Sequence, residues 1–297
     1  MKLLKLIVLT IIFTCFSLSN ETLTNPFLWK VEKDKKVFYL FGTMHLADPK
    51  LQNLPESLKN VIKNVDIVRT EIDLNLKNQL EASKMMMRAD QKSLKDILPK
   101  DIYNRANNYL GTINPNLTLK SFDHMKVWAV ATVITLLKNQ LKYPFLKPID
   151  GIIFNYAKNE KKDIGGIETI HEQLSSMDSF SLREQILELE SSLDYLEKNG
   201  DYLSDMKKLY IQGDKKALMD FINKNMYQMP KYKDLEQKFM QKLVFDRNKR
   251  MAERIEKLVN DNPNKKALFA FGVMHFISKK SILDILKGHG YSIERIK

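Results

Sequence analysis

The sequence contains very little cysteine, with Cys15 as the one example among 297 residues. A single thiol excludes an internal disulfide, a cysteine-based zinc site and an iron–sulfur cluster. Glycine and proline are also scarce, at 10 and 9 residues, which excludes collagen-like and low-complexity chains. Hydrophobic residues make up 44% of the chain, which is enough to build one large domain or two small ones.

Acidic residues are outnumbered, with 36 Asp and Glu against 48 Lys and Arg, giving a net charge of +12. The basic residues are scattered along helical stretches, without an arginine-rich arm, a zinc finger or an aromatic RNA-binding signature. We therefore expect a solvated basic surface and no nucleic-acid partner. Such a surface also allows peripheral association with an anionic membrane.

No apolar run is long enough to span a bilayer, because the two longest, Leu6–Phe16 and Val127–Leu137, have 11 residues each and a spanning helix needs about 20. The first run follows Lys2 and Lys5 and precedes Ser17-Leu18-Ser19. This order is typical of a signal peptide. We expect residues 1–19 to be removed and the chain to be periplasmic or secreted. A retained N-terminal helix or anchor is the alternative.

Apolar strands at both ends of the chain, with long helical stretches between them, predict an α/β fold. We expect a single domain over 20–297, with a central mixed sheet, G-x-x-H motifs at strand ends and large helical insertions. The expected strands are 27–31 and 37–41, which form a hairpin, then 65–72, 162–167, 267–271 and 291–296, and the insertions cover about 75–145 and 170–260.

A five-residue pattern occurs twice, each time after an apolar strand. Phe41-Gly42-Thr43-Met44-His45 is matched by Phe271-Gly272-Val273-Met274-His275, 230 residues later. A strand carries the chain to the carboxyl edge of a sheet, where open α/β folds bind their ligands. Two histidines placed there can share a metal or act on one substrate.

Two carboxylates occupy similar positions, because Glu71 and Glu168 end the strands 65–72 and 162–167. Together with His45 and His275 they form a set of nitrogen and oxygen donors that suits a divalent metal such as Mn, Co or Zn. The remaining histidines have no such pairing, and we interpret them as surface or capping residues: His124, His171 and His289.

Several of these segments resemble the motifs of the TraB/GumN family, which includes the Tiki-type metalloproteases. They are Gly42 to His45, Gly166 to Thr169, Arg247-Asn248 and Gly272 to His275, and the resemblance spans about 25–297. It implies a fold similar to erythromycin-esterase-like proteins and a metal-dependent hydrolase acting on a peptide or a small ester or amide. Where the family has Leu and then Gly after the second His, this chain has Phe276-Ile277-Ser278, so we expect a different pocket floor there.

The resemblance and the strand ends suggest roles for the site residues. His45 and His275 are expected to be metal ligands, with Glu168 as the preferred carboxylate ligand and Glu71 as general base for a metal-bound water. Arg247 and Asn248 are expected on a long helix, 238–258, with only one of them facing the site; Arg247 would bind a substrate carboxylate or an oxyanion.

Three further expectations complete the sequence analysis. Asp150 precedes an apolar helix and is interpreted as its N-cap rather than as a ligand. A non-catalytic envelope protein that binds a peptide, a metal or haem is an alternative to the hydrolase. A structural protein whose histidine pair merely closes the sheet is a third possibility. The sequence does not determine the substrate, the metal or the oligomeric state.

Overall fold

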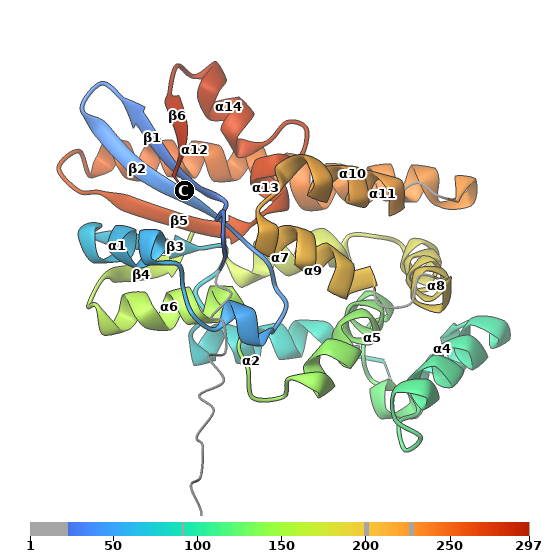
Figure 1. Cartoon of the computed structure of the whole chain (residues 1–297). Coiled ribbons are helices and arrows are strands. Elements are labelled where there is room, and N and C mark those ends of the chain that lie inside the picture. Colours follow the sequence, from blue (N-terminus) through green and yellow to red (C-terminus); the bar gives the residue numbers. More distant parts are fainter. Residues whose placement is uncertain (1–22, 91, 199–201, 226–228, 297) are drawn as a thin grey trace, which may run out of the picture.

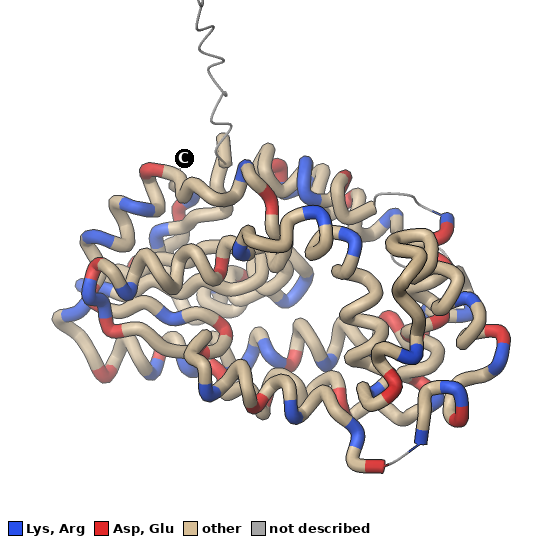
Figure 2. Tube along the Cα trace, turned by 90° about the horizontal axis from the view of Figure 1, so that it is seen from below, with Lys and Arg blue, Asp and Glu red and all other residues tan. Residues whose placement is uncertain are grey.

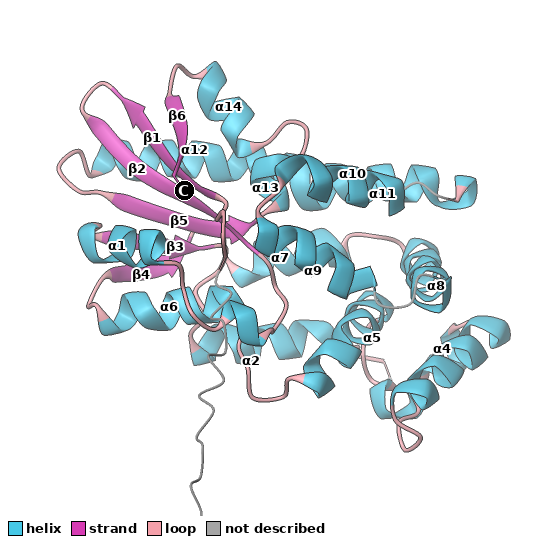
Figure 3. Cartoon of the chain, in the orientation of Figure 1, coloured by secondary structure: helices cyan, strands magenta, loops and turns pink. Residues whose placement is uncertain are grey.

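The structure is a computed structural model that describes residues 23–90, 92–198, 202–225 and 229–296. The expected signal peptide, residues 1–19, lies outside the described residues. The described part contains a six-stranded sheet in the order β4-β3-β5-β2-β1-β6 (Figures 1 and 3). The strands are β1 (Leu28–Lys33), β2 (Lys36–Thr43), β3 (Ile67–Thr70), β4 (Asp163–Gly166), β5 (Ala267–Gly272) and β6 (Ser292–Ile296).

The sheet is mixed, as the sequence predicts. Strands β1 and β2 form the expected antiparallel hairpin, and β6 pairs antiparallel with β1 on its other side. Strands β2, β5, β3 and β4 are parallel neighbours, with Thr43 opposite Gly272 and Thr70 opposite Gly166. The carboxyl ends of these four strands therefore meet at one edge of the sheet.

Helices surround the sheet and extend from one end of it (Figure 3). Their bounds are α1 (Glu56–Asn64), α2 (Leu76–Met86), α3 (Leu94–Ile97), α4 (Lys100–Ile113), α5 (Val127–Lys142), α6 (Ile149–Asn159), α7 (Ile170–Asp178), α8 (Leu182–Lys198), α9 (Tyr202–Gln212), α10 (Lys215–Asn225), α11 (Lys233–Met240), α12 (Asp246–Asp261), α13 (Met274–Ile277) and α14 (Ile282–Gly288). No helix among the described residues has the length and apolar character needed to cross a membrane.

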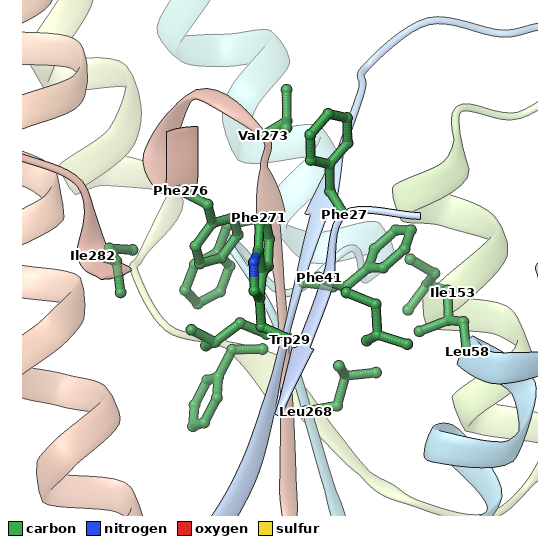
Figure 4. Close-up of a cluster of buried hydrophobic side chains, with 14 of the residues drawn as sticks. Phe27, Trp29, Phe41, Leu58, Ile153, Leu268, Phe271, Val273, Phe276 and Ile282 are labelled. Atoms are coloured by element: carbon green, nitrogen blue, oxygen red, sulfur yellow. The ribbon is translucent and has the colours of Figure 1, made fainter. Parts of the chain in front are cut away.

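The main hydrophobic core lies on both faces of the sheet. Figure 4 shows Leu58 of α1 and Ile153 of α6 on one side of the strands and Phe276 of α13 on the other. The rings of Trp29 and Phe271 contact Phe276, with centroids 5.4 and 5.9 Å away. This aromatic cluster supports the turn that follows β5.

The two helical insertions share a second hydrophobic cluster, away from the sheet. Helices α4, α5 and α8 supply most of it, with Leu110, Ile134 and Leu189 fully buried. Figure 1 places these helices at the end of the molecule remote from β1 and β6. Val127–Leu137, the apolar run noted in the sequence, is thus a buried helix.

The expected helix 238–258 is interrupted. Helix α11 ends at Met240, a π-helical turn covers Gln241–Phe245, and α12 begins at Asp246. The wider turn rotates the start of α12 relative to α11, and Arg247 and Asn248 occupy this start.

Lysines and arginines are distributed over the whole trace, interspersed with acidic residues (Figure 2).

Candidate active site

The four parallel strands deliver four of the predicted site residues to the same edge of the sheet. Glu71 directly follows β3, His45 lies two residues beyond β2, and Glu168 lies two residues beyond β4. His275 belongs to α13, which begins immediately after the turn that follows β5. The expectation that strand ends gather these side chains on one edge is therefore met.

Two histidines and one glutamate converge on a single point. The Nε2 atoms of His45 and His275 lie 3.6 and 3.7 Å from Oε1 of Glu71. The backbone N–H of Gly272 donates a hydrogen bond to the same oxygen, with a length of 2.6 Å. A Cβ atom at this position would lie 3.1 Å from Glu71 Oε1 and 3.2 Å from His45 Nε2, so a larger residue would force these side chains apart by a few tenths of an ångström.

Each imidazole ring is held from behind through its other nitrogen. His45 Nδ1 lies 2.9 Å from Asp150 Oδ2, and His275 Nδ1 lies 2.6 Å from Asn248 Oδ1. Asp150 also accepts a hydrogen bond from Thr43 Oγ1. Both contacts offer oxygen acceptors to Nδ1, so each ring in its neutral form carries its proton on Nδ1 and presents the Nε2 lone pair to Glu71.

Asp150 is not the N-cap that the sequence analysis expected. The N-cap of α6 is Pro148, and Asp150 lies inside the first turn with its carboxylate directed to Thr43 and His45. The earlier interpretation was wrong because the helix begins three residues before Ile152. No sequence pattern linked Asp150 to a histidine 105 positions earlier.

Arg247 joins the two glutamates. Its Nη2 atom donates to Glu71 Oε2 at 2.6 Å and to Glu168 Oε2 at 2.7 Å, and its Nε also donates to Glu168. All three side chains are at least nine-tenths buried. Arg247 also donates from Nη1 to the Leu243 carbonyl, so most of its N–H groups are bound within the protein. Its expected role in binding a substrate carboxylate or an oxyanion stays a prediction.

Glu168 occupies a different position from Glu71. Within the described residues, its carboxylate is hydrogen-bonded to Arg247 and, at 3.4 Å, to Arg250. The structure therefore does not bring Glu168 to the histidines, and Glu71 is the carboxylate that faces them. Although they are adjacent in the sequence, Asn248 and Arg247 both reach the site. Asn248 contacts His275, and Arg247 contacts the two glutamates.

A glutamine completes the surroundings of Glu71. Gln173 of α7 donates from Nε2 to Glu71 Oε2 at 2.7 Å. Gln173 and Asp150 are the two residues of this site that the sequence analysis missed. Gln173 lies one turn past the Thr169 that caps α7, but a lone glutamine on a helix carries no recognisable signal.

The charges of these groups depend on one another. Nearby Asp150 raises the pKa of His45 well above its ordinary value, against the opposing effect of burial. Burial lowers the pKa of His275 to about 4. Burial also acts to raise the pKa of Glu71, but His275, His45 and Arg247 outweigh it and hold that pKa well below its ordinary value. At pH 7 the metal-free site thus combines a neutral His275 with an ionised Glu71 and with a His45 ring whose raised pKa favours its protonated form.

A cavity of about 490 Å³ opens over this group of side chains. His45, Glu71, Gln173, Arg247 and His275 line one part of it. The rest of the lining is mostly apolar and comes from α5, α7, α9, α10, the π-helical turn and the residues that follow β2 and β5. The His45 side chain has 58% of its surface exposed to this open space, whereas His275 has 5%. The volume lies in the range of sites for small molecules or peptide side chains.

Comparison with known proteins places this geometry in a family. The model of the TraB/PrgY/gumN family matches residues 27–295. The chain belongs to the TraB/PrgY/gumN family. The match covers both G-x-x-H motifs and all of the side chains described above, so the resemblance noted from the sequence is confirmed.

The family includes curated relatives at low identity. A "Metalloprotease TIKI homolog" of Nematostella vectensis is 26% identical over 92% of this chain and 67% of its own length. "Metalloprotease TIKI1" of Xenopus tropicalis is 24% identical over 92% and 62% of the two chains, and that of Homo sapiens is 24% identical over 91% and 62%. This chain thus spans about two thirds or less of these relatives. No solved structure matches it significantly.

Proposed function

We propose that this chain is an exported metal-dependent hydrolase that cleaves peptide bonds, with His45, His275 and Glu71 as the metal ligands. The observation that carries the proposal is that two imidazole Nε2 atoms lie 3.6 and 3.7 Å from the same carboxylate oxygen. Two nitrogens and one carboxylate with space beside them are typical of catalytic sites for divalent metals.

The chemistry of the donor set fits a metal, although the spacing is slightly wide. Among the described residues, no group of three or more His, Cys, Asp or Glu side chains is arranged closely enough to hold a metal ion without a shift. Ligands about 2.0–2.1 Å from a metal at tetrahedral angles lie about 3.4 Å apart. The observed separations, 3.6 and 3.7 Å, exceed this by a few tenths of an ångström, so binding a metal requires small shifts of Glu71 and of both rings.

The surrounding residues do what a metal site requires of its protein. Asp150 and Asn248 fix the two rings, and Arg247 and Gln173 fix the second oxygen of Glu71. Outer contacts of this kind orient ligands and support metal affinity. A divalent metal such as Mn²⁺, Co²⁺ or Zn²⁺ would supply Lewis-acid polarisation of a carbonyl and of water there.

Two further parts of the proposal come from outside the site. The relatives' names as metalloproteases support a peptide substrate, in preference to a small ester or amide. The order of charges and apolar residues over 1–19 supports export to the periplasm or the medium. N-terminal sequencing of the protein from its native envelope is expected to begin near Asn20.

The test is calorimetric titration of the purified, untagged chain with Mn²⁺, Co²⁺ and Zn²⁺, followed by a peptidase assay with the best-bound metal. We expect one tight binding event per chain, which His45→Ala and His275→Ala each abolish. Glu71→Gln should lose both metal affinity and activity. Glu168→Gln, the matched carboxylate change 2.7 Å from the same Arg247, should retain the binding event.

Several outcomes would contradict the proposal. Undiminished metal affinity in both histidine variants would remove these residues from the site. Loss of metal in Glu168→Gln with retention in Glu71→Gln would reverse the carboxylate assignment. Tight binding of a peptide or of haem, with no hydrolysis under any metal, would replace the hydrolase with a binding protein.

A further inference from the structure

The large cavity has two chemically different parts. The hydrogen-bonding groups His45, Glu71 and His275 gather at one end, where the strands finish. The lining outside this group is mostly apolar and includes Leu203 and Met206 of α9 and Ile222 of α10. A substrate whose reacting bond lies at the polar end must therefore place an adjoining group against an apolar wall.

From this arrangement we propose that the cavity is a specificity subsite, which accepts a large uncharged side chain beside the cleaved bond of an extended peptide. The inference builds on the proposed hydrolase and adds the substrate class. On this proposal, α9 and α10, which lie outside the strand-end motifs, select the substrate side chain.

The apolar part of the cavity cannot neutralise a charged side chain. The acidic and guanidinium groups that line the cavity are Glu71 and Arg247, which are bonded to each other at 2.6 Å. His45 is held by Asp150 and His275 by Asn248. An aspartate or lysine side chain entering the apolar part would lose its hydration without gaining a partner, and such burial is strongly unfavourable.

The composition of the wall predicts tolerance among apolar side chains. Four methionines line the cavity: Met44, Met177, Met206 and Met274. Methionine is flexible and polarisable, so it adapts to ligands of different shape. We therefore expect leucine, methionine and phenylalanine to be accepted with similar efficiency.

A second cavity indicates that the substrate is a peptide rather than an isolated acyl chain. It has a volume of about 200 Å³ and shares His45, Leu46 and Leu136 with the large cavity. Gln140 and Tyr143 add polar groups to its lining. Space on both sides of His45, apolar on one side and partly polar on the other, suits a chain that passes across the histidine.

The experiment uses blocked glycine heptapeptides with one central residue varied among leucine, methionine, phenylalanine, aspartate and lysine. Cleavage by the metal-loaded chain is followed by mass spectrometry, and binding to the metal-free chain by saturation-transfer NMR. We expect kcat/KM for the leucine peptide to exceed that for the aspartate peptide at least ~100-fold. The three apolar peptides should agree within about 10-fold, and only they should bind.

Variants of the wall test the assignment to α9. Met206→Glu should lower the preference for leucine over lysine by about 10-fold or more, because the new carboxylate offers lysine a partner. Met206→Ala, which does not introduce a charge, should lower kcat/KM for the leucine peptide while keeping metal affinity. Leu80→Glu is the control, because this side chain on α2 is 56% exposed. It should leave unchanged both the preference for leucine over lysine and kcat/KM for the leucine peptide.

The outcomes separate this inference from the proposed hydrolase. Cleavage of all five peptides at similar rates would overturn the subsite and leave the hydrolase standing. Binding of the leucine peptide without cleavage would overturn the hydrolase and leave the subsite standing. If none of the three apolar peptides is bound or cleaved, the peptide subsite is overturned. Turnover of 4-nitrophenyl decanoate in preference to all the peptides would overturn it too.

Discussion

The imidazole Nδ1 of His45 lies 2.9 Å from the Oδ2 atom of Asp150, a residue 105 positions further along the chain. The same carboxylate bonds Thr43 at the end of β2. One side chain of α6 thus fixes both the strand end and the ring that follows it. This contact connects the fold directly to the orientation of a proposed metal ligand.

We expect Asp150→Ala to lower metal affinity by roughly 10- to 100-fold, because His45 loses the acceptor that fixes its ring and tautomer. Calorimetric titration with the metal that binds the unmodified chain measures the effect. Asp220→Ala, which removes an exposed carboxylate paired with Lys216, is the control. Equal affinities in the two variants would show that Asp150 does not orient the ligand.

Replacing Arg247 with Met should destabilise the fold by about 3–5 kcal/mol, since Glu71 and Glu168 would remain buried without their counter-charge. Adding Glu168→Gln to this variant should restore part of the loss. Urea unfolding of the two single variants and the double variant provides the measurement. Arg250→Met is the matched control, because Arg250 is 38% exposed and 3.4 Å from Glu168. If Arg250→Met lowers the free energy of unfolding as much as Arg247→Met does, Arg247 has no special role.

Gly272→Ala should weaken metal binding at least about 10-fold, the size expected when the ligand surroundings are disturbed. The new methyl group would lie 3.1 Å from Glu71 Oε1 and 3.2 Å from His45 Nε2, which is the space that the ligands must close. Gly288→Ala is the control, since nothing lies within 4 Å of the added Cβ. If the Gly272→Ala variant binds the metal as tightly as the unmodified chain, the metal site lies elsewhere.

Glu188 on α8 should make stability depend on pH. Burial raises its pKa from 4.5 to about 8, and its Oε2 has no hydrogen-bond partner within the described structure. Because the folded state binds the proton more tightly than the unfolded chain, the unfolding free energy should fall as pH rises from about 4.5 to about 8, by at most ~5 kcal/mol.

Substitution of this residue provides the check. Glu188→Gln should gain stability over the unmodified chain at pH 8 and little at pH 5, as measured by urea unfolding at both values. Glu253→Gln, at an exposed position on α12, serves as the control. An identical pH dependence in the Glu188 variant would exclude this carboxyl as its source.

Much of the fold followed from local patterns. Alternating and continuous apolar runs predicted all six strands to within a few residues, because burial in a sheet demands them at short range. The helical insertions were also evident, but their shared core was not. Residues such as Leu110 and Leu189 meet only after the chain folds, and helical periodicity does not say which helices are partners.

The π-helical turn at Gln241–Phe245 is another feature that periodicity did not show. The sequence 238–258 is compatible with one regular helix, and we expected a single one of Arg247 and Asn248 to face the site. Both reach it because their partners come from different elements: the glutamates follow β3 and β4, whereas His275 lies in α13. Adjacent residues can thus serve one site from two directions.

By itself, the sequence determined that four chemically active side chains stand at strand ends, since the repeated F-G-x-M-H pattern and the two glutamates follow apolar runs. Parallel pairing then required them to share an edge. Only the tertiary structure decided which carboxylate faces the histidines, because Glu71 and Glu168 end neighbouring strands in the same way. Their difference arises from the strand order, because β3 lies beside β5 whereas β4 is the edge strand. Oε1 of Glu71 therefore accepts the Gly272 N–H and faces His45 and His275, whereas Oε1 of Glu168 faces Arg250.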